Sequence, residues 1–282
     1  MKLAKLEHAA EIKSAAWRIK AETHNNMNQI MLDWQNYIDN LVFGISEQEV
    51  SLLKYIVDHY PVNSALDVAC GDGIAAIMLA EWGISVTALD CDPDRIRNNR
   101  CKSKSAGVQL NFGCADLRDL SKNCKQKCDL ALCLKDSLSR LMTEADIWGT
   151  LVQIYLALEP GGLIVLHTFD YDRLFSTNDF AMKAINDSCL GKKAKISFQH
   201  RTEKTGSRFI IESPAGSIYR EEEPGNKSYI PVRPIYKKEL DIWLAELGFK
   251  KVQALEETAE TNLAGKAWKR VTVAVRPKSA AH

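Results

Sequence analysis

Short apolar segments alternate with longer amphipathic segments through the middle of the chain. The apolar segments have the length of buried strands, and the longer ones repeat apolar side chains at helical spacing. The predicted strands are 65–69, 85–90, 108–112, 129–134 and 163–168, and the predicted helices are 74–82, 93–105 and 143–158. Such alternation is typical of βαβ units, in which helices cover both faces of a parallel sheet.

The pattern differs on either side of this central region. Residues 1–60 are predicted to be helical, and the last of these helices begins near Ser46 and ends before Pro61. Residues 176–236 contain a helix-like piece followed by turn-rich alternating segments, which predict antiparallel strands. These strands are predicted at 195–200, 208–212, 217–220 and 228–232. A helix over 237–247 and strands over 249–255 and 268–275 then resume the α/β pattern.

We therefore expect three parts in the chain. They are an N-terminal helical lid of residues 1–60, an α/β core of residues 61–175 and 237–277, and an antiparallel insert of residues 176–236 on the side of the substrate. At 282 residues the chain is long enough for one large α/β domain with extensions.

The charge balance and the cysteines limit the classes of partner. The chain has 37 basic and 36 acidic side chains, so it lacks the strongly basic surface of a general nucleic-acid binder. No apolar run has the length of a membrane span, and residues 1–21 lack the apolar core of a secretory signal, so we expect a cytoplasmic protein. The eight cysteines include no Cys-x-x-Cys pair, which predicts reduced thiols and no metal site.

A glycine-rich turn joins the first predicted strand to the helix that follows it. Residues 66–73, Leu-Asp-Val-Ala-Cys-Gly-Asp-Gly, end an apolar strand in an acid and then turn sharply. The free N–H groups of the next helix point at this turn, which suits the polar end of a nucleotide-like cofactor. Gly71, Gly73 and Ala76, with Asp90 after the next strand, also fit the dinucleotide fingerprint. The turn alone therefore leaves an NAD-dependent oxidoreductase open.

Three further features favour another cofactor. A buried acid at Asp67 needs a donor, which the ammonium of an amino-acid moiety would supply and a pyrophosphate would not. Asp116, after the third strand, can accept a hydrogen bond from an adenine amine, although it could also be a plain turn acid. The segment 159–162, Glu-Pro-Gly-Gly, precedes the fifth strand, and the chain closes with a helix and two strands.

Together these motifs, spread over residues 65–275, resemble those of the class I S-adenosylmethionine-dependent methyltransferases. The resemblance implies a doubly wound, seven-stranded, mostly parallel sheet whose last strand is antiparallel. The cofactor-binding residues that it implies are Asp67, Ala69, Gly71, Gly73, Asp90, Cys91, Asp116, Leu117, Leu134 and Tyr37. Among them, the turn at 71–73 would hold the methionine part, Asp90 the ribose hydroxyls and Asp116 the adenine amine. Tyr37 would cover the sulfonium through a cation–π contact, unless it only packs the N-terminal helix.

Three segments narrow the resemblance to glycine N-methyltransferase and related small-molecule enzymes. They are residues 34–38, 132–138 and 161–172. Two positions depart from that family: its asparagine after the fourth strand is Asp136 here, and its arginine after the fifth strand aligns with Phe169. Because a phenyl ring cannot grip a carboxylate as a guanidinium does, we expect an acceptor larger and more apolar than glycine.

The reaction that this resemblance implies is an in-line displacement, in which positioning and desolvation supply most of the catalysis. Asp136 and His167 lie at the ends of the fourth and fifth predicted strands, where open α/β sheets bind ligands. Asp136 is the candidate contact to the acceptor and His167 the candidate base, although a strand-end histidine is often structural. We expect N-methylation of a small-molecule amine, with O-methylation of a hydroxyl as the close alternative. A module that binds the cofactor without catalysis, and a homo-oligomeric assembly, are both left open.

Overall fold

The structure of the chain is a computed structural model. It describes residues 45, 47–120, 124, 126–172, 184–187, 192–199, 207–212, 227–251 and 269–278. Within these residues no helix is both long and apolar enough to span a lipid bilayer.

Seven strands form the central sheet. They are β1 (Ser64–Val68), β2 (Ser85–Asp90), β3 (Asn111–Cys114), β4 (Cys128–Cys133), β5 (Leu158–Phe169), β10 (Lys250–Lys251) and β11 (Lys269–Val275). Their order across the sheet is β10-β11-β5-β4-β1-β2-β3. The pairs among β1 to β5 are parallel, and β11 runs antiparallel to both of its neighbours. The predicted seven-stranded sheet with a reversed last strand is confirmed.

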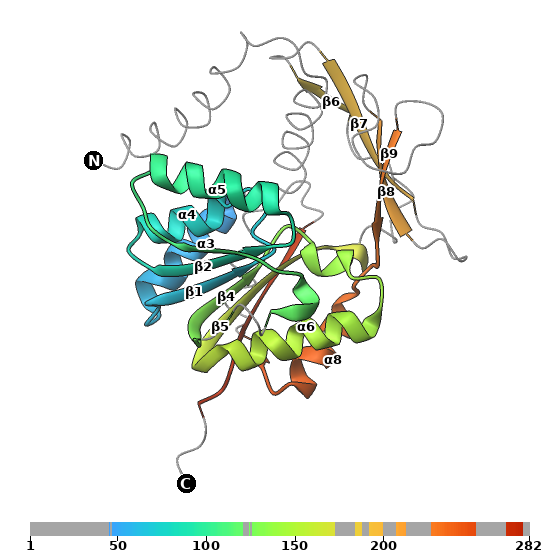
Figure 1. Ribbon diagram of the computed structural model, residues 1–282. Coiled ribbons are helices and arrows are strands. Elements are labelled where there is room, and N and C mark those ends of the chain that lie inside the picture. Colours follow the sequence, from blue (N-terminus) through green and yellow to red (C-terminus); the bar gives the residue numbers. More distant parts are fainter. Residues whose placement is uncertain are drawn as a thin grey trace.

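Helices cover both faces of this sheet (Figure 1). The described helices are α3 (Glu47–His59), α4 (Ile74–Glu81), α5 (Pro93–Ser105), α6 (Glu144–Ala157) and α8 (Lys237–Glu246), with 3-10 turns η1 (Leu117–Asp119) and η2 (Ser137–Arg140). The first three cover one face, and α6 and α8 cover the other. Because helices cover both of its faces, β4 reads as a nearly continuous apolar run, as buried parallel strands do.

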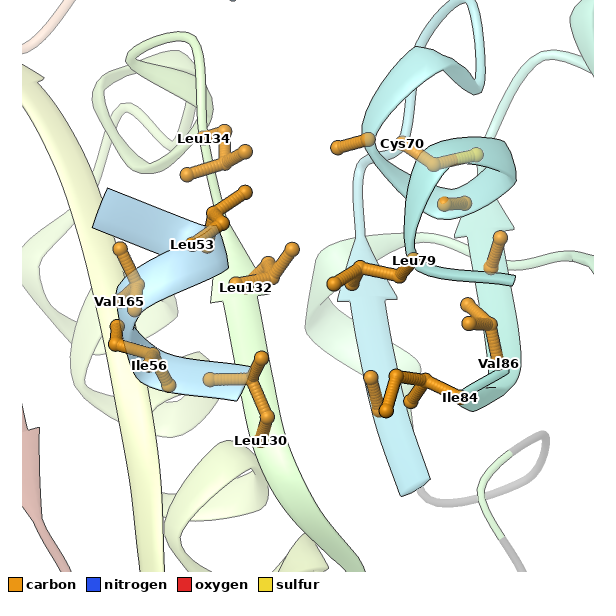
Figure 2. Packing of buried hydrophobic residues seen from close by; sticks show 14 of the residues in the cluster. Leu53, Ile56, Cys70, Leu79, Ile84, Val86, Leu130, Leu132, Leu134 and Val165 are labelled. Atoms are coloured by element: carbon orange, nitrogen blue, oxygen red, sulfur yellow. The ribbon is translucent and has the colours of Figure 1, made fainter. Parts of the chain in front are cut away.

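Leucine, isoleucine and valine side chains fill the layer between α3, α4 and the sheet. Figure 2 shows Leu53 and Ile56 of α3 lying against Leu132 and Val165 of the central strands. All four are at most 3% exposed. The same layer continues to Leu79 of α4, which is fully buried. This packing fixes the ends of β1 and β4, from which the candidate site is built.

Two strands of the central sheet begin several residues away from the predicted positions. β3 begins at Asn111 and not at residue 108, because the N–H of Val108 still bonds to the carbonyl of Ser103 at the end of α5. β5 begins at Leu158, because Leu158 already pairs with Cys128 of β4, and Gly161 and Gly162 exchange backbone hydrogen bonds with Arg276. A shift of register between Cys128 and Leu130 accommodates this extension.

A second, smaller sheet follows β5 in the sequence. Its strands are β6 (Ala184–Asp187), β7 (Lys192–Gln199), β8 (Ser207–Glu212) and β9 (Lys227–Val232). All neighbours are antiparallel in the order β6-β7-β8-β9, and Figure 1 shows them beside the central sheet. β6 was not expected, since the residues after 176 predict a helix-like piece. The strand predicted at 217–220 and the helices predicted before residue 45 lie outside the described residues.

Candidate active site

The turn between β1 and α4 depends on glycine at two positions. Gly71 and Gly73 have φ of 57° and 75°, a region that L-residues rarely adopt. A Cβ on Gly73 would lie 2.8 Å from Cγ of Asn99, so the turn packs directly against α5. Ala69 shares the left-handed conformation with a φ of 56°. Glycine at these two positions therefore lets the turn adopt its left-handed conformation and lie directly against α5.

Asp90, the last residue of β2, holds the turn in place. The Gly71 N–H donates to Asp90 Oδ2 at 2.8 Å, and the Asp92 N–H donates to Oδ1 at 3.0 Å. On the opposite side, Asn99 Nδ2 donates to the Gly71 carbonyl at 2.8 Å. Each carboxylate oxygen of Asp90 accepts one of these bonds and keeps a further lone pair. Asp90 can therefore hold the loop and still accept from a pair of ligand hydroxyls.

A cavity of about 480 Å³ opens at the carboxyl ends of β1, β2, β3 and β4, within the usual size range for small-molecule sites. Six of the predicted cofactor residues line it: Ala69, Gly71, Asp90, Cys91, Asp116 and Leu117. Side chains that the sequence did not single out also line it, including Asp72, Arg95, Arg118, Lys135 and Met142. The structure thus brings together most of the predicted cofactor residues at one place.

Three predicted cofactor residues lie behind the lining. Gly73 is buried against Asn99, Leu134 is 6% exposed within the apolar layer, and Asp67 is 1% exposed inside β1. Tyr37, the remaining one, lies outside the described residues. The individual role of each residue stays a prediction.

Asp67 has a buried acceptor oxygen to which the ammonium group of an amino-acid ligand could donate a hydrogen bond. Its Oδ2 atom is buried and has no hydrogen-bond partner among the described residues. Burial raises the pKa of this carboxyl from 3.8 to about 7, although the nearby Lys135 ammonium lowers it. A buried acceptor without a donor is costly, and an ammonium group in the cavity would relieve that cost.

Asp116 is already engaged by its neighbour Arg118. The backbone N–H and Nε of Arg118 both donate to Oδ1 at 2.8 Å, and an Nη donates to Oδ2 at 2.7 Å. These bonds hold the pKa of Asp116 down at about 2. The carboxylate therefore stays ionised, and an adenine amine would share it with Arg118.

Asp136 is fully buried and has a φ of 58°. Its Oδ1 accepts from the Phe169 N–H at 3.0 Å and from Ser139 Oγ at 2.8 Å, and its Oδ2 accepts from Tyr171 Oη at 2.6 Å. Burial raises the pKa of Asp136, although the three donors oppose the rise. In this arrangement the carboxylate ties the end of β4 to the end of β5 and is absent from the cavity lining. Contact with an acceptor stays a prediction for Asp136.

His167 pairs with a glutamate that the sequence pattern did not reveal. Glu49 Oε1 of α3 lies 2.6 Å from His167 Nδ1, and both side chains are almost fully buried. The Lys135 N–H also approaches Nδ1, at the longer distance of 3.3 Å. The shorter contact requires a proton between Nδ1 and Glu49. The other ring nitrogen, Nε2, is buried without a hydrogen-bond partner among the described residues. A histidine that acts as a base is typically oriented by a carboxylate at one ring nitrogen, while its second ring nitrogen has no hydrogen-bond partner.

An aromatic pair replaces the arginine expected from the family pattern after β5. Phe169 is 1% exposed and Tyr171 is fully buried, with ring centroids 6.2 Å apart and planes at 76°. This is an edge-to-face contact that stabilises the core. Phe169 therefore provides no group that could bind a carboxylate.

Glu49 and Lys135 are among the charged residues that the sequence analysis passed over. Lys135 lies next to Asp136 in the segment 132–138 that resembles the family. Because Asp136 departs from the family pattern, that departure could have drawn attention to Lys135. Glu49 gave no such signal, because its partner lies 118 positions along the chain. In the described part of the chain, no His, Cys, Asp and Glu side chains cluster as metal ligands. The described cysteines are all free thiols.

Comparison with known proteins agrees with this geometry. A family model described as a methyltransferase domain matches residues 65–162. The glycine/sarcosine N-methyltransferase of Parasynechococcus marenigrum (strain WH8102) is 24% identical over 233 residues, covering 82% of this chain and 79% of that protein. The glycine N-methyltransferase of Rattus norvegicus is 32% identical over 161 residues, covering 51% of this chain and 53% of that protein.

The fold is shared with solved structures as well. The crystal structure of an S-adenosylmethionine-dependent methyltransferase from Clostridium acetobutylicum ATCC 824 aligns with a TM-score of 0.66 at 14% identity, covering 87% of this chain and 98% of that one. The glycine spacing of the turn alone admits NAD, and the relatives decide in favour of the methyl donor. The methyltransferase domain matched over residues 65–162, the related N-methyltransferase sequences and the shared fold together support a class I S-adenosylmethionine-dependent methyltransferase.

Proposed function

We propose that this methyltransferase transfers the methyl group to the nitrogen of a small-molecule amine that is larger and more apolar than glycine. The observation that carries the proposal is the aromatic pair of Phe169 and Tyr171 at the end of β5. The position where the glycine N-methyltransferase family has an arginine here holds a buried ring, so an acceptor carboxylate loses its bidentate partner. The N-methyltransferase names of the related sequences support nitrogen as the acceptor atom.

S-adenosylmethionine, when bound, supplies an electrophilic methyl group on a sulfonium. The residues of the chain then have two tasks, which are to align the acceptor behind that methyl group and to keep water away from it. We propose that Asp90 binds the ribose hydroxyls and that Asp116 binds the adenine edge at the β2 and β3 end of the cavity. An amine bound as ammonium must lose a proton before it can attack, and His167 Nε2 is the candidate acceptor of that proton.

A panel of acceptors tests the proposal. The purified protein is incubated with S-adenosylmethionine and one acceptor at a time, and the S-adenosylhomocysteine formed is quantified by mass spectrometry. The panel contains glycine, sarcosine, primary and secondary amines of increasing size, and phenols and alcohols of matched shape. We expect kcat/KM for the best large amine to exceed that for glycine by about tenfold or more, which one lost charged contact accounts for. Glycine as the best acceptor would contradict the proposal.

The pair of Glu49 and His167 favours a second candidate, methylation of a hydroxyl. A hydroxyl needs a base more than an amine does, and this buried pair is built like one. If the acceptor is a hydroxyl, Glu49→Gln should lower kcat by about tenfold to a hundredfold and shift the pH at which kcat falls. The same variant should change kcat little for an amine that binds in its neutral form. Phenols outperforming every amine in the panel would select this second candidate.

A further inference from the structure

A lysine and an aspartate from two different loops meet at one wall of the cavity. Lys135 follows β4 and Asp72 lies in the turn after β1, and Lys135 Nζ donates to Asp72 Oδ1 at 2.7 Å. Both residues line the cavity, and their side chains keep 15% and 12% exposure. A ligand can therefore reach this ion pair, although most of its surface is withdrawn from water.

The backbone holds Lys135 in a conformation that a lysine rarely adopts. Its φ is 59°, and among the described residues only Ala69 and Asp136 share a positive φ without being glycine. Such a conformation is unfavourable for a residue with a side chain and persists where surrounding contacts enforce it, often at ligand sites. The Lys135 N–H contacts His167 Nδ1, and the side chain reaches the turn 63 positions earlier in the chain. The loop after β4 thus directs the Lys135 ammonium toward the glycine turn.

The order of the strands places this pair at one end of the cavity. β4 and β1 are neighbours, and β2 and β3 lie on the far side of β1. Asp90 and Asp116, the candidates for ribose and adenine, follow β2 and β3. The ion pair after β1 and β4 is therefore at the end that remains for the amino-acid moiety of the cofactor.

The amino-acid moiety of the cofactor carries one ammonium and one carboxylate. The cavity wall carries one group of the opposite charge for each of them. The Lys135 ammonium has three N–H donors, of which Asp72 takes one. Asp72 is an ionised acceptor in the cavity, and Asp67 of β1 has a buried Oδ2 with no hydrogen-bond partner among the described residues. We propose that Lys135 and Asp72 form a clamp for the amino-acid end of the methyl donor, in which Lys135 binds the carboxylate and Asp72, together with Asp67, binds the ammonium.

The ion pair also limits the electrostatic repulsion between Lys135 and the sulfonium of the cofactor. A lone lysine near the sulfonium would repel it, since both are cations at short range. Lys135 is neutralised by Asp72 before the cofactor binds, and by the cofactor carboxylate as well when it is bound. This inference depends on the methyl donor and not on the acceptor proposed above.

Four ligands test the clamp on the unmodified protein by titration calorimetry. S-adenosylhomocysteine carries the whole amino-acid end, and 5′-methylthioadenosine carries none of it. S-adenosylmethionine and its decarboxylated form differ only in the carboxylate. We expect the decarboxylated form to bind about tenfold to a hundredfold more weakly than S-adenosylmethionine, as the loss of one charged hydrogen bond predicts. Equal affinities of the two forms would overturn the role of Lys135.

Variants then assign the effect to the side chain. Lys135→Met should weaken S-adenosylhomocysteine by about tenfold or more and leave 5′-methylthioadenosine within about twofold. Lys135→Arg keeps the charge and should retain most of the preference for S-adenosylhomocysteine. The matched control is Lys102→Met, because Lys102 Nζ donates to the backbone carbonyl of Asp72 at 2.9 Å from outside the cavity lining. That control should leave the ratio of the two affinities unchanged.

The other outcomes overturn the clamp. An equal loss for both ligands in Lys135→Met means a general packing defect, and no loss means that the ion pair is only structural. The same change in Lys102→Met means a general effect of positive charge. If Lys135→Met does not fold, as thermal melting would show, the comparison of ligands on the unmodified protein decides alone. Failure of the clamp in a protein that still produces S-adenosylhomocysteine with an amine leaves the proposed function intact.

Discussion

Replacing Asp67 with asparagine should remove a pH-dependent destabilisation of the folded protein. Burial raises the pKa of this carboxyl from 3.8 to about 7. Well below pH 3.8 the group is protonated in both states, so its burial causes no pH-dependent loss of stability there. As the pH rises toward about 7, the unfolded carboxyl ionises while the folded one keeps its proton, so stability is lost until the folded carboxyl ionises as well. At about 1.4 kcal/mol for each pKa unit, the loss approaches about 4 kcal/mol.

The first measurement is the free energy of unfolding of Asp67→Asn and of the unmodified protein by urea titration between about pH 4 and pH 8. The difference between the two proteins should grow by about 4 kcal/mol across this range, in favour of the variant at high pH. The difference should be concentrated above about pH 5, where the unfolded carboxyl is already ionised. A difference that stays constant with pH would refute the raised pKa.

The second measurement links the same proton to the cofactor. An ammonium beside Asp67 would lower its pKa, so binding of S-adenosylhomocysteine should release a proton from the protein. With a pKa of about 7, the release is about 0.9 proton at pH 6, about half a proton at pH 7 and about 0.1 at pH 8. Calorimetry in buffers of different ionisation enthalpy counts these protons. Asp67→Asn is the control, because it subtracts the titration of the ligand itself, and equal proton counts in both proteins would refute the reasoning.

Two further substitutions test the packing of the site, both by urea unfolding. Gly73→Ala should cost about 2–3 kcal/mol, because it combines a φ of 75° with a Cβ 2.8 Å from Asn99, whereas Gly83→Ala, with a φ of 87° and nothing within 4 Å, should cost only about 1 kcal/mol. Equal costs would mean that Asn99 moves aside without penalty. Tyr171→Phe removes the 2.6 Å bond to Asp136 and should cost about 2–3 kcal/mol, since a buried carboxylate loses a donor. A cost below about 0.5 kcal/mol would show that Asp136 is protonated or rehydrated in the variant.

The elements of the core could be predicted because their signals are local. Pro93 at the start of α5, with Asp92 as its cap, and Gly248 after α8 mark helix ends within a few residues. The glycine turn could be recognised for the same reason, since its conformation depends on the residues of the turn. β3 was misplaced because the bond from Val108 back to Ser103 competes with strand pairing, and the apolar pattern does not reveal which bond forms.

The contacts of the catalytic candidates could not be predicted, because their partners are distant in the sequence. Asp136 and His167 were identified by their places at strand ends, but that placement does not determine which way a side chain points. Asp136 finds its donors at Phe169 and Tyr171, 33 and 35 positions away. His167 finds Glu49 on a helix that precedes the sheet. Such pairs follow from how helices pack on the sheet, which hydrophobic periodicity leaves unspecified.

The departures from the glycine N-methyltransferase pattern are physically coupled. Asp136 replaces an asparagine, and its second oxygen accepts from Tyr171, whose ring packs against Phe169. The Phe169 N–H donates to the same carboxylate, and the Lys135 N–H contacts His167. Because these groups share partners, a change at one position alters the cost of a change at another. Restoring an arginine at Phe169 alone would place a guanidinium into a packed, buried position, and it would not recreate a carboxylate site. The proposed preference for an acceptor without a carboxylate would therefore be a property of the linked ends of β4 and β5, and not of a single residue.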